Sequence, residues 1–495
     1  RALGGSLWAV GQTVGSKVLV LAQQYLLAIL LFQEDFAPLA VAGFILAFAS
    51  FGQQLGVIEI LVRRHRTFDL WANTAFWLNL SAGVVGMLVV FACAPLAAHI
   101  FVMPMLVPFL AIGAAAIPLD ALAAVPQAKL THEMRFRALS VIGTLNVLAT
   151  TVLTVTLAAL HFGPYSLIIP KPLVSGAQAL ALFFAAGLRP SLTPHFRRWK
   201  VLFRDARYFL VINFFGAFIT NGDYLTGGFF FPKPILGSYY FAFNASTQTN
   251  QLVANNLASV LLPSFTKMRE PQRQIDAYSR VCGLIAFIGI PLCVLQAACA
   301  QPLFHLLFAH KWDTALTLFA ILSLGMLFVL PSDPTVTMLK AQGRYRLLMY
   351  WTFVVSTGFI AAVLSGALTR SIVGLATGVA IFYVVVGPVG CTLPVPGIGA
   401  KLSHVARVYA GPLIFSVVAA GVAIAASFPI QGDTKEANAA RLLIRGTGLC
   451  VVYAGLSKLF LKRHLREALH VWSLLSVKIL RRRPMTVPVP SGKLK

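Results

Sequence analysis

The sequence predicts an all-α polytopic membrane protein of about fourteen transmembrane helices, in which two blocks of six helices precede two additional C-terminal helices. Three observations predict this class. Only 11% of the 495 residues are charged and 58% are hydrophobic, whereas about a quarter of the residues of a soluble domain are charged. Apolar runs long enough to cross ~30 Å of hydrocarbon recur along the chain. The segments between these runs alternate between basic and nearly uncharged.

Hydropathy predicts each span in turn. The first apolar run is as long as a full span and lacks a small-residue cleavage site, so we expect a retained helix rather than a signal peptide. The segments between spans are short and leave no room for a soluble catalytic domain. The fourteen predicted spans are 8–32, 37–61, 73–95, 105–126, 138–160, 165–188, 208–231, 235–262, 279–300, 314–338, 347–368, 371–394, 406–428 and 441–461.

The distribution of Lys and Arg predicts the orientation of these spans. With both termini in the cytoplasm, 32 of the 40 basic residues fall on the cytoplasmic side and six on the opposite side. The remaining two, Lys17 and Arg445, fall within spans. This imbalance is a strong positive-inside signal, and one missed helix would destroy the alternation. We therefore expect a multi-pass protein with both termini in the cytoplasm.

The basic segment 189–207 divides the hydrophobic chain into two blocks of similar size, residues 1–188 and 208–394. Six spans fall in each block, so both blocks enter the membrane in the same orientation, as parallel repeats do. We expect an N-terminal six-helix lobe, a cytoplasmic basic linker and a C-terminal six-helix lobe. Residues 395–461 add two further transmembrane helices.

The last segment, residues 462–495, places apolar residues at helical spacing and keeps lysines and arginines off that stripe. This pattern predicts an amphipathic basic tail on the cytoplasmic leaflet, where it would contact anionic membrane lipids. A partner-binding helix is the alternative. The net charge of +25 lies in this tail and in short loops. It therefore indicates topology and lipid contact and does not predict nucleic-acid binding.

Polar residues gather in the two spans that are joined by the turn at residues 231–234. The first span holds Asn213, Thr220, Asn221, Asp223 and Tyr224. The second holds Tyr240, Asn244, Gln248, Gln251, Asn255 and Ser259. Steps of three or four residues place this second set on one helical face. Inside a membrane such a polar stripe needs protein or water beside it. It predicts either a helix that lines a wet central cavity or a set of interhelical hydrogen bonds.

Lys17 is a second candidate, because it lies near the middle of the first span, where a charge is costly and indicates a site. Gln24 lies on the same helical face, two turns further along. We expect Lys17 either to contact an anionic ligand in a cationic cavity or to form an ion pair with a buried carboxylate, Asp223 or Asp120.

Three aspartates are candidates for ion coupling. Asp223 would bind a proton or a cation, or would act as a hydrogen-bond partner within the polar stripe. Asp120 and Asp333 stand beside prolines. Because proline frees backbone carbonyls, an irregular turn at these two positions would suit an ion or water. A span end near the membrane interface is the favoured alternative for both.

No metal site or cofactor is predicted. The six cysteines lie in apolar segments without metal-ligand spacing, and the ten histidines are scattered. His305 and His310 have no obvious partners. The outer loops are short, so a membrane-embedded enzyme, such as a polysaccharide polymerase or an acyltransferase, is disfavoured.

Five short motifs stand at the ends of the predicted spans. They are residues 33–37 (QEDFA), 126–137 (PQAKLTHEMRFR), 163–167 (GPYSL), Asp223 followed by 236–242 (LGSYYFA), and 341–346 (AQGRYR). Each is weak alone, but their order and placement, from the first span to about the twelfth, resemble the bacterial polysaccharide transporter family, the Wzx-type flippases. Ala37 stands where that family usually has Gly.

The resemblance implies the fold of the multidrug/oligosaccharidyl-lipid/polysaccharide exporter superfamily, with two six-helix lobes around a central cavity and alternating access. It implies a flippase rather than an enzyme. The substrate would be undecaprenyl-pyrophosphate-linked oligosaccharide repeat units, moved from the cytoplasmic to the periplasmic leaflet of the bacterial inner membrane for exopolysaccharide, O-antigen or capsule assembly. An H⁺ or Na⁺ gradient would drive the cycle, and the polysaccharide polymerase machinery would be a partner.

The candidate residues suit such a substrate, because amides and hydroxyls can bind sugars and a lysine can bind pyrophosphate. The expected cavity residues are Lys17, Gln24, Asn213, Asn221, Tyr240, Asn244, Gln248, Gln251 and Asn255. Two alternatives from the same superfamily stay open. A multidrug extruder would use acidic cavity residues, which Asp223 and Asp120 could supply. A lipid II flippase would be expected to have more arginine in its cavity.

Overall fold

The computed structural model describes residues 2–50, 68–188, 196–253, 261–262, 264–266, 268, 270–396, 398–430 and 432–460. Within these ranges the regular structure is α-helix with a few short 3-10 turns, as the sequence predicts. The predicted amphipathic tail, residues 462–495, lies outside the described ranges.

The helices follow one another with short connections. Those of the first block are α1 (Ala2–Leu30), η1 (Gln33–Phe36), α2 (Ala37–Ala49), α4 (Phe68–Ile100), α5 (Leu106–His132), α6 (Phe136–Ala159), η4 (Gly163–Leu167) and α7 (Pro170–Ala186). Those that follow are α8 (Phe196–Phe230), α9 (Lys233–Ser246), α10 (Gln248–Val253), α12 (Pro271–Phe308), α13 (Asp313–Val329), η5 (Leu330–Ser332), α14 (Pro334–Ala341), α15 (Tyr345–Ala367), α16 (Ile372–Thr392), α17 (Ile398–Ser427) and α18 (Lys435–Phe460).

Ten segments in the described ranges are long and apolar enough to cross a membrane, and they coincide with ten of the fourteen predicted spans. They are α4, α5, α6, η4 with α7, α12, α13 with α14, α15, α16, α17 and α18. The other four predicted spans correspond to α1, α2, α8 and α9 with α10. Because α2 and α10 run up to residues outside the described ranges, the total of fourteen stays a prediction.

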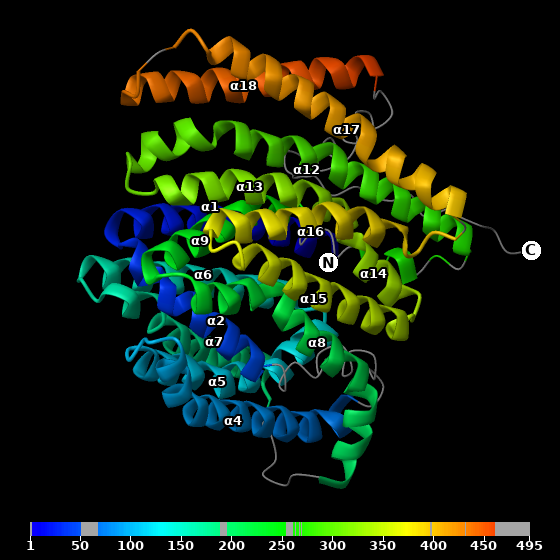
Figure 1. Cartoon of the computed structure of the whole chain (residues 1–495). Helices are drawn as coiled ribbons and strands as arrows, with labels where there is room; N and C mark the ends of the chain where they lie inside the picture. Colours follow the sequence, from blue (N-terminus) through cyan, green and yellow to red (C-terminus); the bar gives the residue numbers. More distant parts are fainter. Residues whose placement is uncertain are drawn as a thin grey trace, which may run out of the picture.

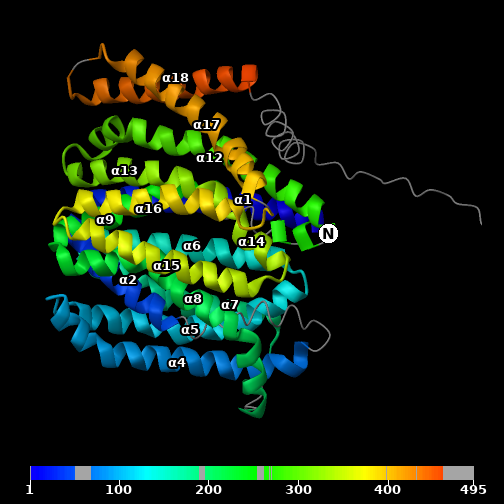
Figure 2. The ribbon, with the colours of Figure 1, turned by 45° about the vertical axis from the view of Figure 1, so that its right-hand side comes forward.

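The helices lie side by side in one bundle (Figures 1 and 2), with α4 at one edge and the pair α17 and α18 at the opposite edge. α12 lies between that pair and α13. In the first block α5 packs against α4 and α7, and α1 packs against α6. In the second block α13 packs against α9 and α16, and α8 packs against α15. The two blocks meet directly, because α2 packs against α8 and η1 packs against α9.

Two segments differ from the prediction. The predicted span 235–262 is not one uninterrupted helix, because α9 ends at Ser246 and α10 begins at Gln248. α5 runs unbroken through Pro118 and Pro126, so the irregular turn expected at Asp120 is wrong, whereas its expected place at a span end near the interface stays a prediction. Proline is tolerated inside membrane helices because neighbouring groups can satisfy the freed carbonyls. The irregular turn expected beside Asp333 is confirmed as η5.

Glycines allow the closest helix contacts. On Gly387 of α16, an added Cβ atom would lie 1.9 Å from the carbonyl oxygen of Phe328 on α13. Because Gly387 has no side chain, the backbones of α16 and α13 can approach each other closely at this position, as small residues commonly permit in membrane proteins. Gly421 of α17 has no neighbouring atom within 4 Å of the same position.

We predict that Gly387→Ala lowers the melting temperature of the purified protein in detergent, whereas Gly421→Ala does not. The added methyl group of Gly387→Ala must displace backbone, and overpacking of this kind costs about 1–3 kcal/mol. Equal melting temperatures for both variants would contradict the close packing of α16 on α13.

Candidate functional site

The polar stripe of α9 and α10 is partly satisfied within its own helix. The amide of Asn244 donates to the carbonyl of Tyr240 at 2.9 Å and to the hydroxyl of Tyr224 at 3.2 Å. The amide of Gln248 donates to the carbonyl of Asn244 at 3.1 Å. Its side-chain oxygen is buried and has no hydrogen-bond partner among the described residues. The stripe therefore offers amide oxygens near the break at Thr247.

Lys17 lies beside this stripe. The half-buried ammonium of Lys17 on α1 donates a hydrogen bond to the side-chain oxygen of Gln251 on α10. Two residues 234 positions apart, which the sequence singled out separately, thus meet between the first and second blocks. Among the described residues Lys17 forms no ion pair with Asp223 or Asp120, so that alternative is wrong. A lysine whose hydrogen-bond partner among the described residues is a neutral amide keeps its charge available for an anion.

The remaining predicted cavity residues are more dispersed. Gln24 is half-buried on α1, and Asn213 is half-buried on α8. The amide of Asn221 donates to the hydroxyl of Thr220 at 2.9 Å, and its side chain faces Gly43 of α2. Asn255 lies outside the described residues.

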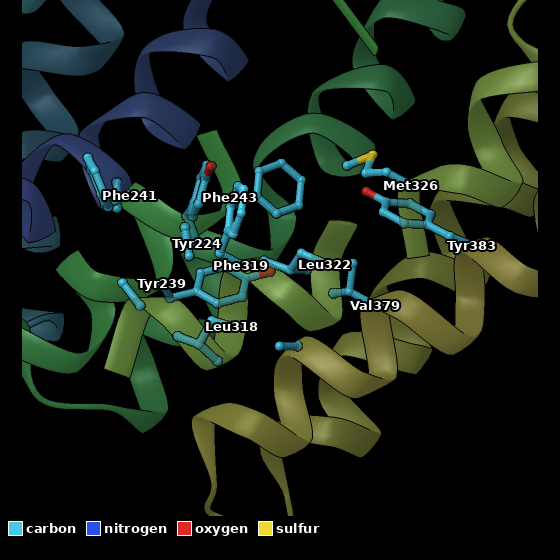
Figure 3. Close-up of a cluster of buried hydrophobic side chains, with 14 of the residues drawn as sticks. Tyr224, Tyr239, Phe241, Phe243, Leu318, Phe319, Leu322, Met326, Val379 and Tyr383 are labelled. Carbon is cyan, nitrogen blue, oxygen red and sulfur yellow. The ribbon is translucent and has the colours of Figure 1, made fainter. Parts of the chain in front are cut away.

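Asp223 on α8 is completely buried, and it is held by Tyr239 of α9, whose hydroxyl donates to Oδ2 at 2.7 Å. Its other oxygen, Oδ1, is buried without a well-formed hydrogen bond to any described residue. Tyr239 itself belongs to a buried apolar cluster (Figure 3) that also includes Tyr224, Phe243, Phe319 and Leu322. A buried carboxylate is costly unless it is fully hydrogen-bonded, protonated or paired with a cation. Of the three predicted aspartates, Asp223 is the one with this environment.

Asp333 lies in the second block between η5 and α14, and its side chain lies near Asn250 of α10. Tyr383 of α16 lies near both Asp333 and Asp223. Asp120 is half-buried on α5, which packs against α4 and α7. The second block therefore contains two of the coupling candidates near one tyrosine, and Asp120 stands apart on the first block.

At one end of the bundle, the turn between α12 and α13 closes over the end of α1. The ammonium of Lys311 donates to three carbonyls, those of Ala28 at 3.0 Å and Ile29 at 2.9 Å in the last turn of α1 and that of Leu31 at 2.7 Å directly after it. The side chain of Gln33 in η1 donates to the backbone carbonyl of Lys311. The last carbonyls of a helix have no partner within it and carry partial negative charge, so a lysine is a favourable cap.

Aromatic packing completes this contact. Trp312 is fully buried, donates its indole N–H to the carbonyl of Ala28 at 3.1 Å, and stacks on Phe241 of α9 at 4.3 Å between ring centroids. Gly237 of α9 lies so close to η1 that an added Cβ atom would be 1.7 Å from the carbonyl oxygen of Gln33. We call the group Gln33, Gly237, Lys311 and Trp312 with the last turn of α1 the Lys311 clasp. It joins the two blocks at this end.

One group at the same end was missed by the sequence analysis. His305, His310, Asp313 and Asp433 lie together, with four nitrogen–oxygen distances between 2.9 and 3.4 Å. The expectation that the two histidines lack partners is therefore wrong. Spacings of five and three residues from His305 to His310 and Asp313 were visible in the sequence. Asp433 comes from the α17–α18 turn, 128 residues after His305, and no local pattern could have assigned it.

The fold is that of a multi-pass membrane protein. It is shared with the lipid II flippase MurJ in an inward closed conformation, with a TM-score of 0.73 and 14% identity over 92% of this chain and 99% of that one. It is also shared with an inward-facing multidrug resistance transporter of the MATE family, with a TM-score of 0.60 and 14% identity over 79% of this chain and 95% of that one.

A family described as "Polysaccharide biosynthesis protein" matches residues 26–317, more than half of the chain, and the chain belongs to this family. It is similar to the lipopolysaccharide biosynthesis protein WzxC of Escherichia coli K12, with 23% identity over 76% of this chain and 77% of that protein. It is also similar to the succinoglycan biosynthesis transport protein ExoT of Rhizobium meliloti 1021, with 24% identity over 74% of each. The teichuronic acid biosynthesis protein TuaB of Bacillus subtilis 168 is 22% identical over 91% of this chain and 94% of that protein.

The chain is therefore a polysaccharide biosynthesis protein by family, and its fold is one that a lipid II flippase and a multidrug resistance transporter also have. The resemblance to the Wzx-type family is confirmed. The individual cavity and coupling residues stay predictions.

We predict that Tyr239→Phe destabilises the purified protein by about 1–3 kcal/mol, because Asp223 loses its hydroxyl donor while it stays buried. Tyr350→Phe is the matched control, since Tyr350 is 62% exposed. Thermal unfolding in detergent measures both variants. If Tyr239→Phe melts like the control, the bond to Asp223 does not stabilise the fold.

Proposed function

We propose that this protein flips undecaprenyl-pyrophosphate-linked oligosaccharide repeat units from the cytoplasmic to the periplasmic leaflet of the bacterial inner membrane, for exopolysaccharide, O-antigen or capsule assembly. The contact between Lys17 and Gln251 carries the proposal, because it sets a cation beside sugar-binding amides where the two blocks meet. Membership of the polysaccharide biosynthesis family supports the class of substrate.

The chemistry of the substrate explains this pairing. A pyrophosphate and several sugars would strand many polar groups in hydrocarbon, so a flippase must supply partners along the path. Lys17 would bind the pyrophosphate through charge-assisted hydrogen bonds. Gln251, Gln248 and Asn244 would exchange their present partners for sugar hydroxyls, and the ring of Tyr240 would pack on a sugar face. The lipid tail stays in the bilayer.

Alternating access would use the two six-helix lobes, residues 1–188 and 208–394. In the structure the Lys311 clasp joins them at the end that charge alternation assigns to the periplasm. Release on that side would require the clasp to open, and the described state would then be the one closed toward the periplasm. Residues 395–461 would be carried along as two additional helices, and the tail 462–495 would rest on anionic lipid. The polymerase machinery would receive the product.

Ion coupling would involve Asp223, with Asp333 in the same lobe. A proton or Na⁺ at Oδ1 of Asp223 would supply the partner that this buried oxygen lacks among the described residues. Binding and release of that cation would change the cost of burying the carboxylate, which is a means of linking an ion gradient to movement of α8 against α9.

The proposal is tested by deleting the gene in its host and extracting lipid-linked sugars. Loss of surface polysaccharide with accumulation of undecaprenyl-pyrophosphate-linked repeat units is expected. Unchanged polysaccharide with sensitivity to cationic drugs would identify a multidrug extruder instead. Arrest of cell-wall synthesis with accumulated lipid II would identify a lipid II flippase.

In the deletion strain, Lys17→Ala should restore polysaccharide at least about tenfold less well than the wild type, because a hydrogen bond to a charged group contributes about 1.5–3 kcal/mol. Lys17→Arg should restore most of it. Lys171→Ala, at an exposed lysine of α7, is the control and should behave as wild type. Full activity of a stably expressed Lys17→Ala protein would remove Lys17 from the site.

The clasp gives a separate prediction. In a background with exposed Cys93 and Cys450 replaced by Ser, a Gln33→Cys/Lys311→Cys protein should react with a short bifunctional thiosulfonate reagent. Cross-linking should stop transport, and reduction should restore it, because a locked periplasmic end prevents release. Each single-cysteine variant should show the same activity after the treatment as before it, whatever that activity is. Undiminished transport by the cross-linked protein would show that this end need not open.

A further inference from the structure

The group of His305, His310, Asp313 and Asp433 has an unusual pattern of contacts, because each imidazole ring bridges both carboxylates. Asp433 faces Nδ1 of His305 at 2.9 Å and Nε2 of His310 at 3.2 Å. Asp313 faces Nε2 of His305 at 3.4 Å and Nδ1 of His310 at 3.0 Å. All four ring nitrogens are therefore opposite carboxylate oxygens.

This pattern calls for added positive charge. A neutral histidine carries one N–H donor and one nitrogen lone pair, so two neutral histidines supply two protons for four nitrogen–oxygen contacts. In the other two contacts a lone pair would face a carboxylate oxygen. A divalent cation between these two nitrogens and the carboxylate would remove this repulsion, because it would coordinate both lone pairs and a carboxylate oxygen.

The two oxygens of Asp433 are positioned to accept hydrogen bonds from Nδ1 of His305 and Nε2 of His310. Oδ1 of Asp433 already accepts a hydrogen bond at 2.7 Å from the amide of Asn438, which is 1% exposed. Asp433 thus lies against one nitrogen of each ring, which leaves Nε2 of His305 and Nδ1 of His310 facing Asp313.

We propose that His305, His310 and Asp313 bind one Zn²⁺ ion, with Asp433 as the carboxylate that orients both imidazoles. One ligand atom from each of the three residues lies within 4.8 Å of the others. Small side-chain rotations would therefore place each ligand atom ~2.0–2.2 Å from a central Zn²⁺ ion, as zinc coordination requires. Two imidazoles and one carboxylate suit zinc better than Mg²⁺ or Ca²⁺, which prefer oxygen ligands.

The surroundings leave room for a fourth ligand. The side chain of His305 is 13% exposed, whereas those of His310 and Asp313 are 65% and 52% exposed, so water can complete a tetrahedral site. The ion would join the α12–α13 turn to the α17–α18 turn. The first of these turns also carries Lys311 and Trp312, so zinc would steady the turn on which the Lys311 clasp depends. This inference does not rest on the identity of the transported substrate.

The test uses the full-length protein, purified in detergent with a tag that contains no histidine and stripped with a chelator. Calorimetric titration with Zn²⁺ should show one saturable site per chain, and Zn²⁺ should raise the melting temperature. His310→Ala, at the most exposed of the four side chains, should fold normally, lose more than tenfold in affinity and lose the thermal shift. Asp433→Asn should weaken binding about 10- to 100-fold, as loss of an outer carboxylate does.

His161→Ala, at an exposed histidine in the α6–η4 turn, is the matched control and should bind zinc like the wild type. Two results would overturn the site. One is the absence of a stoichiometric Zn²⁺ ion in the wild type. The other is zinc binding that His310→Ala and Asp433→Asn leave unchanged, which would locate the metal elsewhere.

Discussion

The hydrogen bonds from Lys311 to the end of α1 support the whole contact between the two blocks at one end of the bundle. The last carbonyls of a helix have no partner within it, and a membrane interior offers little water to replace one. In this protein the partner comes from a turn almost 300 residues away in sequence. Once Lys311 is placed, Trp312 is fixed among Phe36 and Phe241, and η1 can rest on Gly237. The docking of α1, η1 and α9 at this end follows from one capped helix terminus.

Two polar contacts of the site, Asp223–Tyr239 and Lys17–Gln251, differ in how a movement between the two blocks would affect them. Asp223 and Tyr239 both belong to the second block, and their bond is enclosed by aromatic rings. A movement between the blocks would leave it intact. Lys17 and Gln251 belong to different blocks and are only half-buried. Their bond is therefore the one that a substrate can enter or that a relative movement can break.

Hydropathy and charge were sufficient to predict ten spans, with ends that differ from those of the observed segments by up to eight residues, as at α12, because membrane insertion depends on local apolar length. Lys17 and the polar stripe were also recognisable, since a polar group at that depth is conspicuous in an apolar run. Their pairing was not recognisable, because it joins residues 234 positions apart. For the same reason, the sequence could not predict the contacts of Asp433 with His305 and His310, or those of Lys311 with the end of α1. At Pro118 the local rule was misleading, since tertiary contacts allow a proline inside a membrane helix.

The capping of α1 by another part of the chain also affects how this end can open. When Lys311 withdraws, three carbonyls, an indole N–H and an ammonium group all need new partners at the same moment. Water is the only group abundant enough to supply them, so separation of the blocks at this end is a hydration step. Opening of this end therefore depends on water activity, whereas opening of an end closed by apolar side chains alone would not depend on it in this way.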